Sequence, residues 1–334
     1  MPRMIESTKR VALAVIGALI LSVASSLTPR AAAQTGAELL IRPFAEGENL
    51  ELNTSAVFQA QGEDDFGGDL GLNVYEVSAR AREVRERAIP RIGYDLTYID
   101  IDSEVGVFGK LLPERLVDQS VAVGLAMPDI YGFRGGFTVG VGYAGDSPFG
   151  DANAWYGKAT IAMGKKIDEN TDLGVFLDYD GNRSFLPDVP LPGFAYRKRI
   201  DKELILVAGV PLSTIEWTPD DTWKFELFWT MIDSFDARVT YKVSERFNVY
   251  ANLDSRNHAF HIDELESENE RLLFKETRAE LGVQWEPMKD TRVIFAGGYA
   301  FGQEFSTGWD FRDDDEITEL SDEPYVRAGL EIRF

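Results

Sequence analysis

Cysteine is absent from this chain of 334 residues, and histidine occurs only twice. The lack of cysteine excludes disulfides, thiolate nucleophiles and cysteine-ligated metals. Two histidines leave few ways to build a site around a histidine base. Positive charge is also scarce, with 34 Lys and Arg against 56 Asp and Glu and a net charge of −22. Because nucleic-acid phosphates call for Lys and Arg, we expect no nucleic-acid partner. We also expect that the protein has no enzyme activity and binds no cofactor.

Long apolar runs are missing except near the N-terminus. Residues 11–27 form one apolar run, with Arg3, Lys9 and Arg10 before it and the small residues 31–33 after it. This order is typical of a secretory signal peptide. The run of 17 residues is at the short limit for a membrane span, so removal is favoured over an uncleaved anchor. We interpret residues 1–33 as a cleaved signal peptide and residues 34–50 as a short periplasmic lead-in.

The C-terminal residues alternate between apolar side chains and side chains that are charged or glycine. The apolar set is Val326, Ala328, Leu330, Ile332 and Phe334. A period of two places these residues on one face of a strand and the charged ones on the other. Lipid outside and water inside a closed barrel would suit the two faces, although a soluble sandwich could also end on such a strand.

This ending resembles the C-terminal assembly signal of bacterial outer-membrane β-barrels, in which a terminal aromatic closes an alternating strand. The resemblance implies recognition by the barrel assembly machinery. It also implies insertion among outer-membrane lipid and lipopolysaccharide in a Gram-negative bacterium.

The same alternation recurs from residue 53 onward, and no stretch of comparable length keeps a helical period, which indicates an all-β class. Short turns such as 168–170 and 244–245 alternate with long polar loops. These loops are residues 102–114, 145–153, 181–192, 258–270 and 303–322. Short turns on one rim and long loops on the other are typical of single-chain outer-membrane barrels. We therefore predict one closed antiparallel transmembrane β-barrel over residues 51–334.

The number of strands depends on two segments. Apolar side chains fall on odd positions all the way from Trp223 to Val243, a stripe of 21 residues, whereas a spanning strand needs about 9–11. Either Ile232-Asp233-Ser234 is a hairpin loop or one long strand projects beyond the membrane. Residues 203–217 have the same ambiguity at Pro211. We predict 14 strands, or 16 if both segments are hairpins.

The last part of the chain resembles a family of bacterial outer-membrane β-barrels that is defined only as a domain of unknown function. The likeness rests on Gly298-Tyr299-Ala300-Phe301-Gly302, on the closing strand 326–334 and, more weakly, on Trp217-Thr218-Pro219-Asp220-Asp221. It covers about residues 170–334. It implies a barrel and carries over no catalytic residue.

Charged residues opposite the apolar faces are candidates for the lining of the lumen. The set is Arg197, Arg199, Arg238, Lys242, Arg256, Glu276, Arg278, Glu280, Arg327, Glu331 and Arg333. One interpretation is a polar channel whose cations attract anionic or polar solutes. The other is a network of opposite charges that neutralise one another and fill a narrow barrel. Strand facing does not set the bore, so both interpretations stay open.

Two clusters are weak candidates for metal binding. His258 and His261 share a predicted outer loop with Asp263, and imidazole with carboxylate suits a divalent metal. The loop has no H-E-x-x-H helix, and a solvated polar loop is the favoured interpretation. The acidic loop 309–323 could hold divalent cations loosely, but it lacks the spacing of an EF-hand.

These observations lead to two functional hypotheses. The first is a porin-like outer-membrane channel for the passage of small polar solutes. The alternative is a structural or surface-interaction barrel without transport activity.

The closing strand generates one test. Deleting Phe334, or replacing it with Asp, should sharply reduce membrane assembly, because the terminal aromatic belongs to the predicted signal and its strand must close the sheet. The measurement is the fraction of chains that migrate as a compact band on unheated gels and resist protease. The same change at Phe311, an aromatic of the acidic loop, is the control. Normal assembly of both Phe334 variants would contradict the hypothesis.

Overall fold

The computed structural model describes residues 35–42, 44, 47–65, 68–85, 88–103, 106–107, 110–230, 234–262, 265 and 270–334. The predicted signal peptide, residues 1–33, lies outside the described residues and stays a prediction. Within the described ranges, no helix is long and apolar enough to cross a membrane.

The described chain is almost entirely β-sheet, as the two-residue period predicts. One short helix, α2 (Glu38–Ile41), precedes the first strand. The strands are β1 (Leu50–Gln59), β2 (Gly62–Glu63), β3 (Asp69–Arg82), β4 (Ile89–Ser103), β5 (Gly106–Val107), β6 (Lys110–Leu111), β7 (Arg115–Ile130), β8 (Phe133–Gly145), β9 (Trp155–Asp168), β10 (Thr171–Asp180), β11 (Leu191–Arg199), β12 (Leu204–Val210), β13 (Leu212–Trp217), β14 (Trp223–Thr230), β15 (Phe235–Lys242), β16 (Phe247–Phe260), β17 (Arg271–Met288), β18 (Thr291–Gly308), β19 (Asp314–Leu320) and β20 (Glu323–Arg333).

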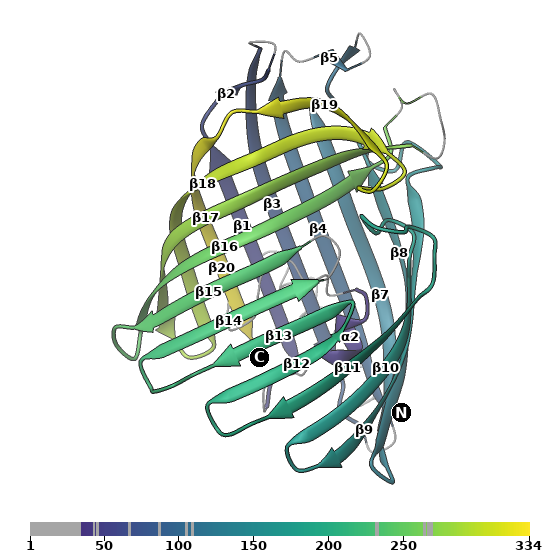
Figure 1. Ribbon diagram of the computed structural model, residues 1–334, viewed down its shortest axis with the longest axis vertical. Coiled ribbons are helices and arrows are strands. Elements are labelled where there is room, and N and C mark those ends of the chain that lie inside the picture. Colours follow the sequence, from purple (N-terminus) through teal and green to yellow (C-terminus); the bar gives the residue numbers. More distant parts are fainter. Residues whose placement is uncertain are drawn as a thin grey trace, which may run out of the picture.

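The sheet closes on itself, because the first strand pairs with the last. β1 lies antiparallel to β20, with Ala56 opposite Ala328, and β20 pairs on its other edge with β18. Sixteen strands form the wall of this barrel (Figure 1), while the short β2 and β19 add to β3 and β18. The prediction of a closed antiparallel all-β barrel is confirmed.

The prediction of 14 strands is wrong, and the alternative of 16 is correct. β12 and β13 form a hairpin around Pro211, and β14 and β15 form another. In an antiparallel hairpin, paired residues point to the same face. Trp229 pairs with Phe235, so odd positions face outward on both sides of the turn. The apolar stripe therefore runs through the hairpin without interruption, and the period alone cannot reveal the turn.

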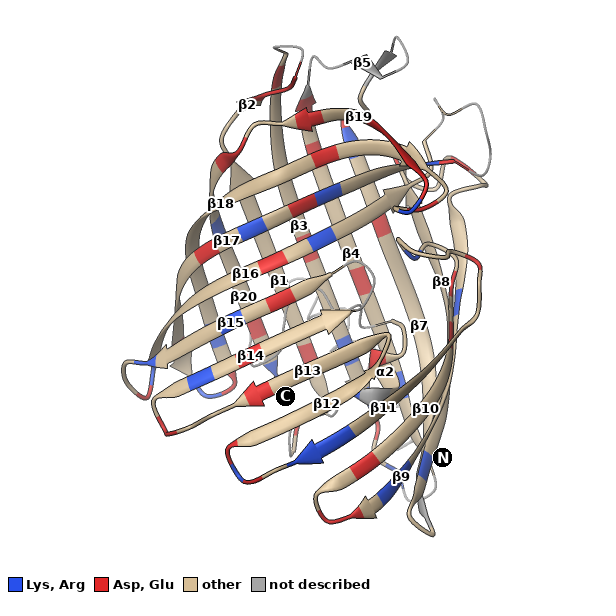
Figure 2. Ribbon diagram, in the orientation of Figure 1, with Lys and Arg blue, Asp and Glu red and all other residues tan. Residues whose placement is uncertain are grey.

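The two faces of the wall differ in polarity. Outward positions carry large apolar side chains that are well exposed, such as Phe295 and Val326, each 60% exposed. Inward positions carry charged side chains that are buried, such as Arg278 and Arg327, each 2% exposed. Figure 2 shows how the charged residues are spread over the strands. An apolar exterior around a polar interior, in a sheet without edges, defines a membrane β-barrel.

The barrel has two unequal ends, which we call the turn end and the loop end. The turn end holds the short connections such as 169–170 and 289–290, and the loop end holds the long ones such as 146–154 and 181–190. Strands β12 to β15 have only six to eight residues, whereas β17 and β18 have 18 each. Hairpins β12–β13 and β14–β15 therefore stop below the loop end, as Figure 1 shows.

The loop end of the barrel is filled by apolar side chains. Phe260, Leu272, Phe274 and Phe305 are all fully buried there, within a larger cluster that also draws on β1, β3, β4 and β7. The outer end of β16 meets β8, where the N–H of His261 donates to the carbonyl of Ala144 at 3.0 Å. No residue of β9 to β15 belongs to this cluster of described residues. The loop end of the barrel therefore has a packed apolar core.

The orientation of the wall can be tested with a single charge. Phe295→Arg should lower the stability of the membrane-embedded fold by about 2–4 kcal/mol, because the guanidinium would face lipid near the midplane. The measurement is urea unfolding in lipid vesicles. Val243→Arg is the control, since this exposed apolar residue lies in a connection at the turn end. Equal stability of the two variants would mean that Phe295 does not face lipid.

Candidate functional site

The predicted lumen residues fall into two groups. Six are buried in the middle of the barrel on β15, β16, β17 and β20. These six are Arg238, Arg256, Glu276, Arg278, Glu280 and Arg327. The other five lie toward the turn end of their strands and are less deeply buried. These five are Arg197, Arg199, Lys242, Glu331 and Arg333.

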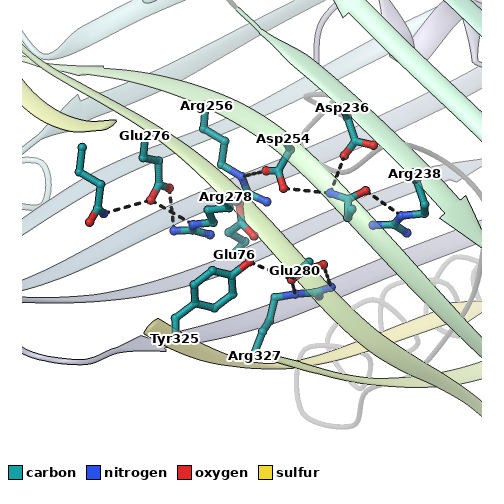
Figure 3. A network of polar contacts seen from close by, with 12 residues as sticks. Glu76, Asp236, Arg238, Asp254, Arg256, Glu276, Arg278, Glu280, Tyr325 and Arg327 are labelled. Atoms are coloured by element: carbon teal, nitrogen blue, oxygen red, sulfur yellow. Dashed lines mark hydrogen bonds and ion pairs between the residues drawn. The ribbon is translucent and has the colours of Figure 1, made fainter. Parts of the chain in front are cut away.

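The buried group belongs to a network of ion pairs and hydrogen bonds (Figure 3). Glu280 is its most heavily bonded carboxylate. The guanidinium of Arg327 donates to both oxygens of Glu280, at 2.6 and 2.8 Å. The hydroxyls of Tyr250 and Tyr325 donate to the same carboxylate at 3.0 and 3.2 Å. These side-chain contacts join β17 to β20, which is not its neighbour in the sheet, and they add to the backbone pairing of β17 with β16.

Arg256 crosses the lumen. Its Nη1 lies 2.6 Å from Glu76 Oε1 on β3, and its Nε lies 2.5 Å from Asp254 Oδ2 on β16. β3 and β16 are not neighbours in the sheet, so the Arg256–Glu76 pair ties two separate parts of the wall together. Beside it, Arg278 lies 2.6 Å from Glu276. Arg238 donates to the amide oxygen of Asn252 at 3.0 Å.

The second group pairs more loosely, near the turn end. Lys242 lies 2.9 Å from the exposed Glu245, and Arg197 lies 3.2 Å from Asp172. Glu331 accepts from Arg292 at 3.4 Å, and Arg333 lies 3.4 Å from Glu48. Arg199 is exposed at the last position of β11. Solvent reaches the pairs of Lys242 with Glu245 and of Arg197 with Asp172, so these two contribute little to stability.

The predicted histidine loop is partly wrong. His258 belongs to β16, where it pairs with Phe274 of β17, and its ring stacks on Phe260 with centroids 6.2 Å apart. The strand simply extends three residues further than the alternation suggested. Asp263 lies outside the described residues. In the described part of the chain, no three His, Asp or Glu residues gather in a way that could hold a metal ion.

The segment expected as a lead-in lies inside the turn end of the barrel. The guanidinium of Arg91 donates to the carbonyls of Leu39 and Leu40 at 2.6 and 2.9 Å. Arg80 donates to the carbonyl of Arg42 at 2.8 Å and lies over the ring of Phe44 at 4.1 Å. We call residues 35–42 and 44 the lumen segment. Arginines at inward positions of β3 and β4 therefore hold it against the wall.

Glu38 gives the lumen segment an unusual carboxyl group. Burial raises the pKa of Glu38 to about 7, against a partial lowering by Arg42 and a further rise from Asp95. One of its oxygens is buried without a hydrogen-bond partner. No pattern in the sequence indicated this placement, because a two-residue period identifies strands and the lumen segment is not a strand.

A polar cavity of about 420 Å³ lies between the lumen segment and the apolar cluster. Arg42 lines it from the lumen segment, Asp118 and Lys158 from β7 and β9, and Asp236 from β15. Ser234, just before β15, and Ser184 of the 181–190 connection also line it. The cavity thus reaches the level at which the short hairpin β14–β15 ends.

Sequence reasoning missed Asp118, Lys158 and Asp236 as lumen residues. Lys158 is buried beside Asp180, at 3.1 Å, and Asp118 accepts from the hydroxyl of Tyr156 at 2.6 Å. All three occupy even positions, and the odd positions of their strands include exposed apolar residues such as Val121, Ile161 and Tyr241. The alternation therefore indicated that these residues face inward, but only the fold shows that their strands meet around one cavity.

The fold and the charged lumen define the class: a 16-stranded antiparallel membrane β-barrel with a largely filled interior. The sequence matches no family model, so the resemblance to a domain of unknown function stays a prediction. It also matches no curated protein.

Solved outer-membrane barrels are similar in architecture. The Pseudomonas putida toluene transporter TodX aligns with a TM-score of 0.42 and 9% identity over 93% of this chain and 95% of that one. An outer membrane channel from Pseudomonas putida F1 aligns at 0.37 and 10%, over 87% and 99%. The translocator domain of the autotransporter NalP from Neisseria meningitidis aligns at 0.31 and 10%, over 87% and 90%. At this level of identity the similarity concerns the fold and does not identify a solute.

The buried network generates a stability test. Glu280→Met should cost about 3–5 kcal/mol, because it leaves the Arg327 guanidinium buried without its carboxylate. The double variant Glu280→Met/Arg327→Met should cost less than the single one, since neither charge then remains. The measurement is urea unfolding in lipid vesicles. Glu245→Ala, which breaks the exposed pair with Lys242, should cost about 0–1 kcal/mol. A double variant that is less stable than the single one would contradict the argument.

Proposed function

We propose that the protein is a channel of the outer membrane of a Gram-negative bacterium, through which small polar solutes pass. The observation that carries this proposal is the polar cavity of about 420 Å³ inside a closed barrel. Its lining comes from strands on all sides of the lumen, including β3, β9 and β16. A cavity of this size and polarity suits a small hydrophilic molecule.

The apolar exterior supports the location in a membrane. Only a sheet without edges satisfies its backbone groups in lipid, and the pairing of β1 with β20 achieves this. The predicted signal peptide supports export, and the closing strand ending at Phe334 supports assembly by the barrel machinery.

The route through the barrel follows from what fills its two ends. At the turn end, the lumen segment lies between the cavity and the periplasm, held by Arg80 and Arg91. At the loop end, the apolar cluster occupies the axis. The cavity reaches Ser234 and Ser184, where the wall of β12 to β15 has already stopped. The path therefore runs past the lumen segment, through the cavity and out beside the tip of β14–β15.

The alternative, a structural or surface-interaction barrel, is favoured by the side chains that fill the lumen. The middle of the barrel is crossed by the Arg256–Glu76 ion pair, and the loop end has a packed apolar core. A barrel filled in this way is stiff whether or not solutes pass through it.

Conductance across planar lipid bilayers tests the channel. The protein should show discrete open steps, and Arg91→Ala should enlarge or prolong them severalfold, because the carbonyls of Leu39 and Leu40 lose their donor and the lumen segment is released. Arg197→Ala is the control, since this arginine also lies toward the turn end but pairs with Asp172. If neither the unmodified protein nor Arg91→Ala conducts, and both fold normally, transport is rejected and the hypothesis of a structural barrel remains.

A further inference from the structure

The lining of the cavity is more acidic than the predicted set of lumen residues, in which Lys and Arg predominate. Seven carboxylates line the cavity, against four Lys and Arg side chains. Local net charge inside a low-dielectric cleft concentrates ions of opposite sign. This excess of carboxylates favours positively charged solutes. The sequence had instead suggested a channel whose cations attract anionic or polar solutes.

The cations of the cavity are all occupied. Lys158 lies 3.1 Å from Asp180, and Arg256 lies close to both Asp254 and Glu76. Arg183 pairs with Asp178 at 2.7 Å, and Arg42 with Glu51 at 3.4 Å. An anionic solute would therefore have to break an existing ion pair to find a cation.

Asp236, in contrast to these paired cations, has a carboxylate oxygen without a hydrogen-bond partner. It is 3% exposed, at the second position of β15, and it lines the cavity. Its Oδ2 accepts one long hydrogen bond, from Asn252 at 3.4 Å, and its Oδ1 has no hydrogen-bond partner. Across the described residues, no Lys or Arg lies within 4.0 Å of this carboxylate. A buried carboxylate oxygen normally has a donor, so this one is available to a ligand.

We propose that the cavity binds small organic cations that carry a primary ammonium group, with Asp236 as the carboxylate that receives them. The ammonium donates to Asp236 Oδ1, and the short alkyl part lies against Phe228, which pairs with Asp236 across β14 and β15 and lines the same end of the cavity. Asp236 stands next to Ser234 at the tip of β14–β15, where the proposed path leaves the barrel. This inference rests on the proposed channel for its role in transport, but binding itself does not require conduction.

Three probes of equal length test the assignment: n-butylammonium, n-butanol and butyrate. Isothermal titration of the full-length protein in detergent micelles should detect binding of n-butylammonium only. Asp236→Asn should weaken this binding at least tenfold, because the amide keeps the shape but not the charge. Asp236→Glu should retain most of it. Glu245→Gln, which removes one carboxylate at the turn end outside the cavity, should bind like the unmodified protein.

Bilayer recordings in a potassium chloride gradient give the second readout. The reversal potential should show cation preference, n-butylammonium should reduce the open current, and Asp236→Asn should diminish both effects. Binding by titration without any conductance would reject the channel and keep the cation site. Conductance without binding, or with equal binding of butyrate, would overturn the cation site and keep the channel. Equal affinity of Asp236→Asn and the unmodified protein would overturn the role of Asp236.

Discussion

The pairing of β1 with β20 is the constraint on which the rest of this structure depends. A sheet in lipid cannot leave backbone donors and acceptors unpaired, because no water is present to satisfy them. The ladder from Glu51 opposite Arg333 to Gln59 opposite Tyr325 removes the last two edges. Once the sheet is closed, each strand must present one face to lipid and the other to the lumen. Apolar side chains outside and charged side chains inside follow from that division.

The interior then has to accommodate many charges in little space. Burying an ion is costly unless its partner and its remaining hydrogen bonds are in place. Glu280 meets this condition with Arg327 and two tyrosine hydroxyls, and Arg256 meets it by reaching across to Glu76. The network thus limits the bore, and the open cavity is confined to the part of the lumen that the network leaves free.

The position of the cavity results from three unequal pieces of the fold. The lumen segment fills the turn end, the apolar cluster fills the loop end, and the short hairpins β12–β13 and β14–β15 lower one side of the wall. Asp236 lies where these features meet, buried but without a full set of donors. A carboxylate in that position gives the cavity a chemical preference that the overall charge of the chain does not reveal.

The class of the fold and the face that each strand turns to lipid follow from the amino-acid sequence, because strand side chains alternate with a fixed period of two. The alternation assigns Glu276, Arg278, Glu280 and Arg327 to the faces opposite the apolar ones, but it does not indicate that their side chains form one network. It could not decide between 14 and 16 strands, since paired residues in a hairpin such as Trp229 and Phe235 share a face and hide the turn. Three features became visible only in the three-dimensional structure: the largely filled lumen, the position of His258 within β16 and the entry of the lumen segment into the barrel. Bore and filling depend on contacts between distant strands, such as Arg256 with Glu76, which local periodicity does not encode.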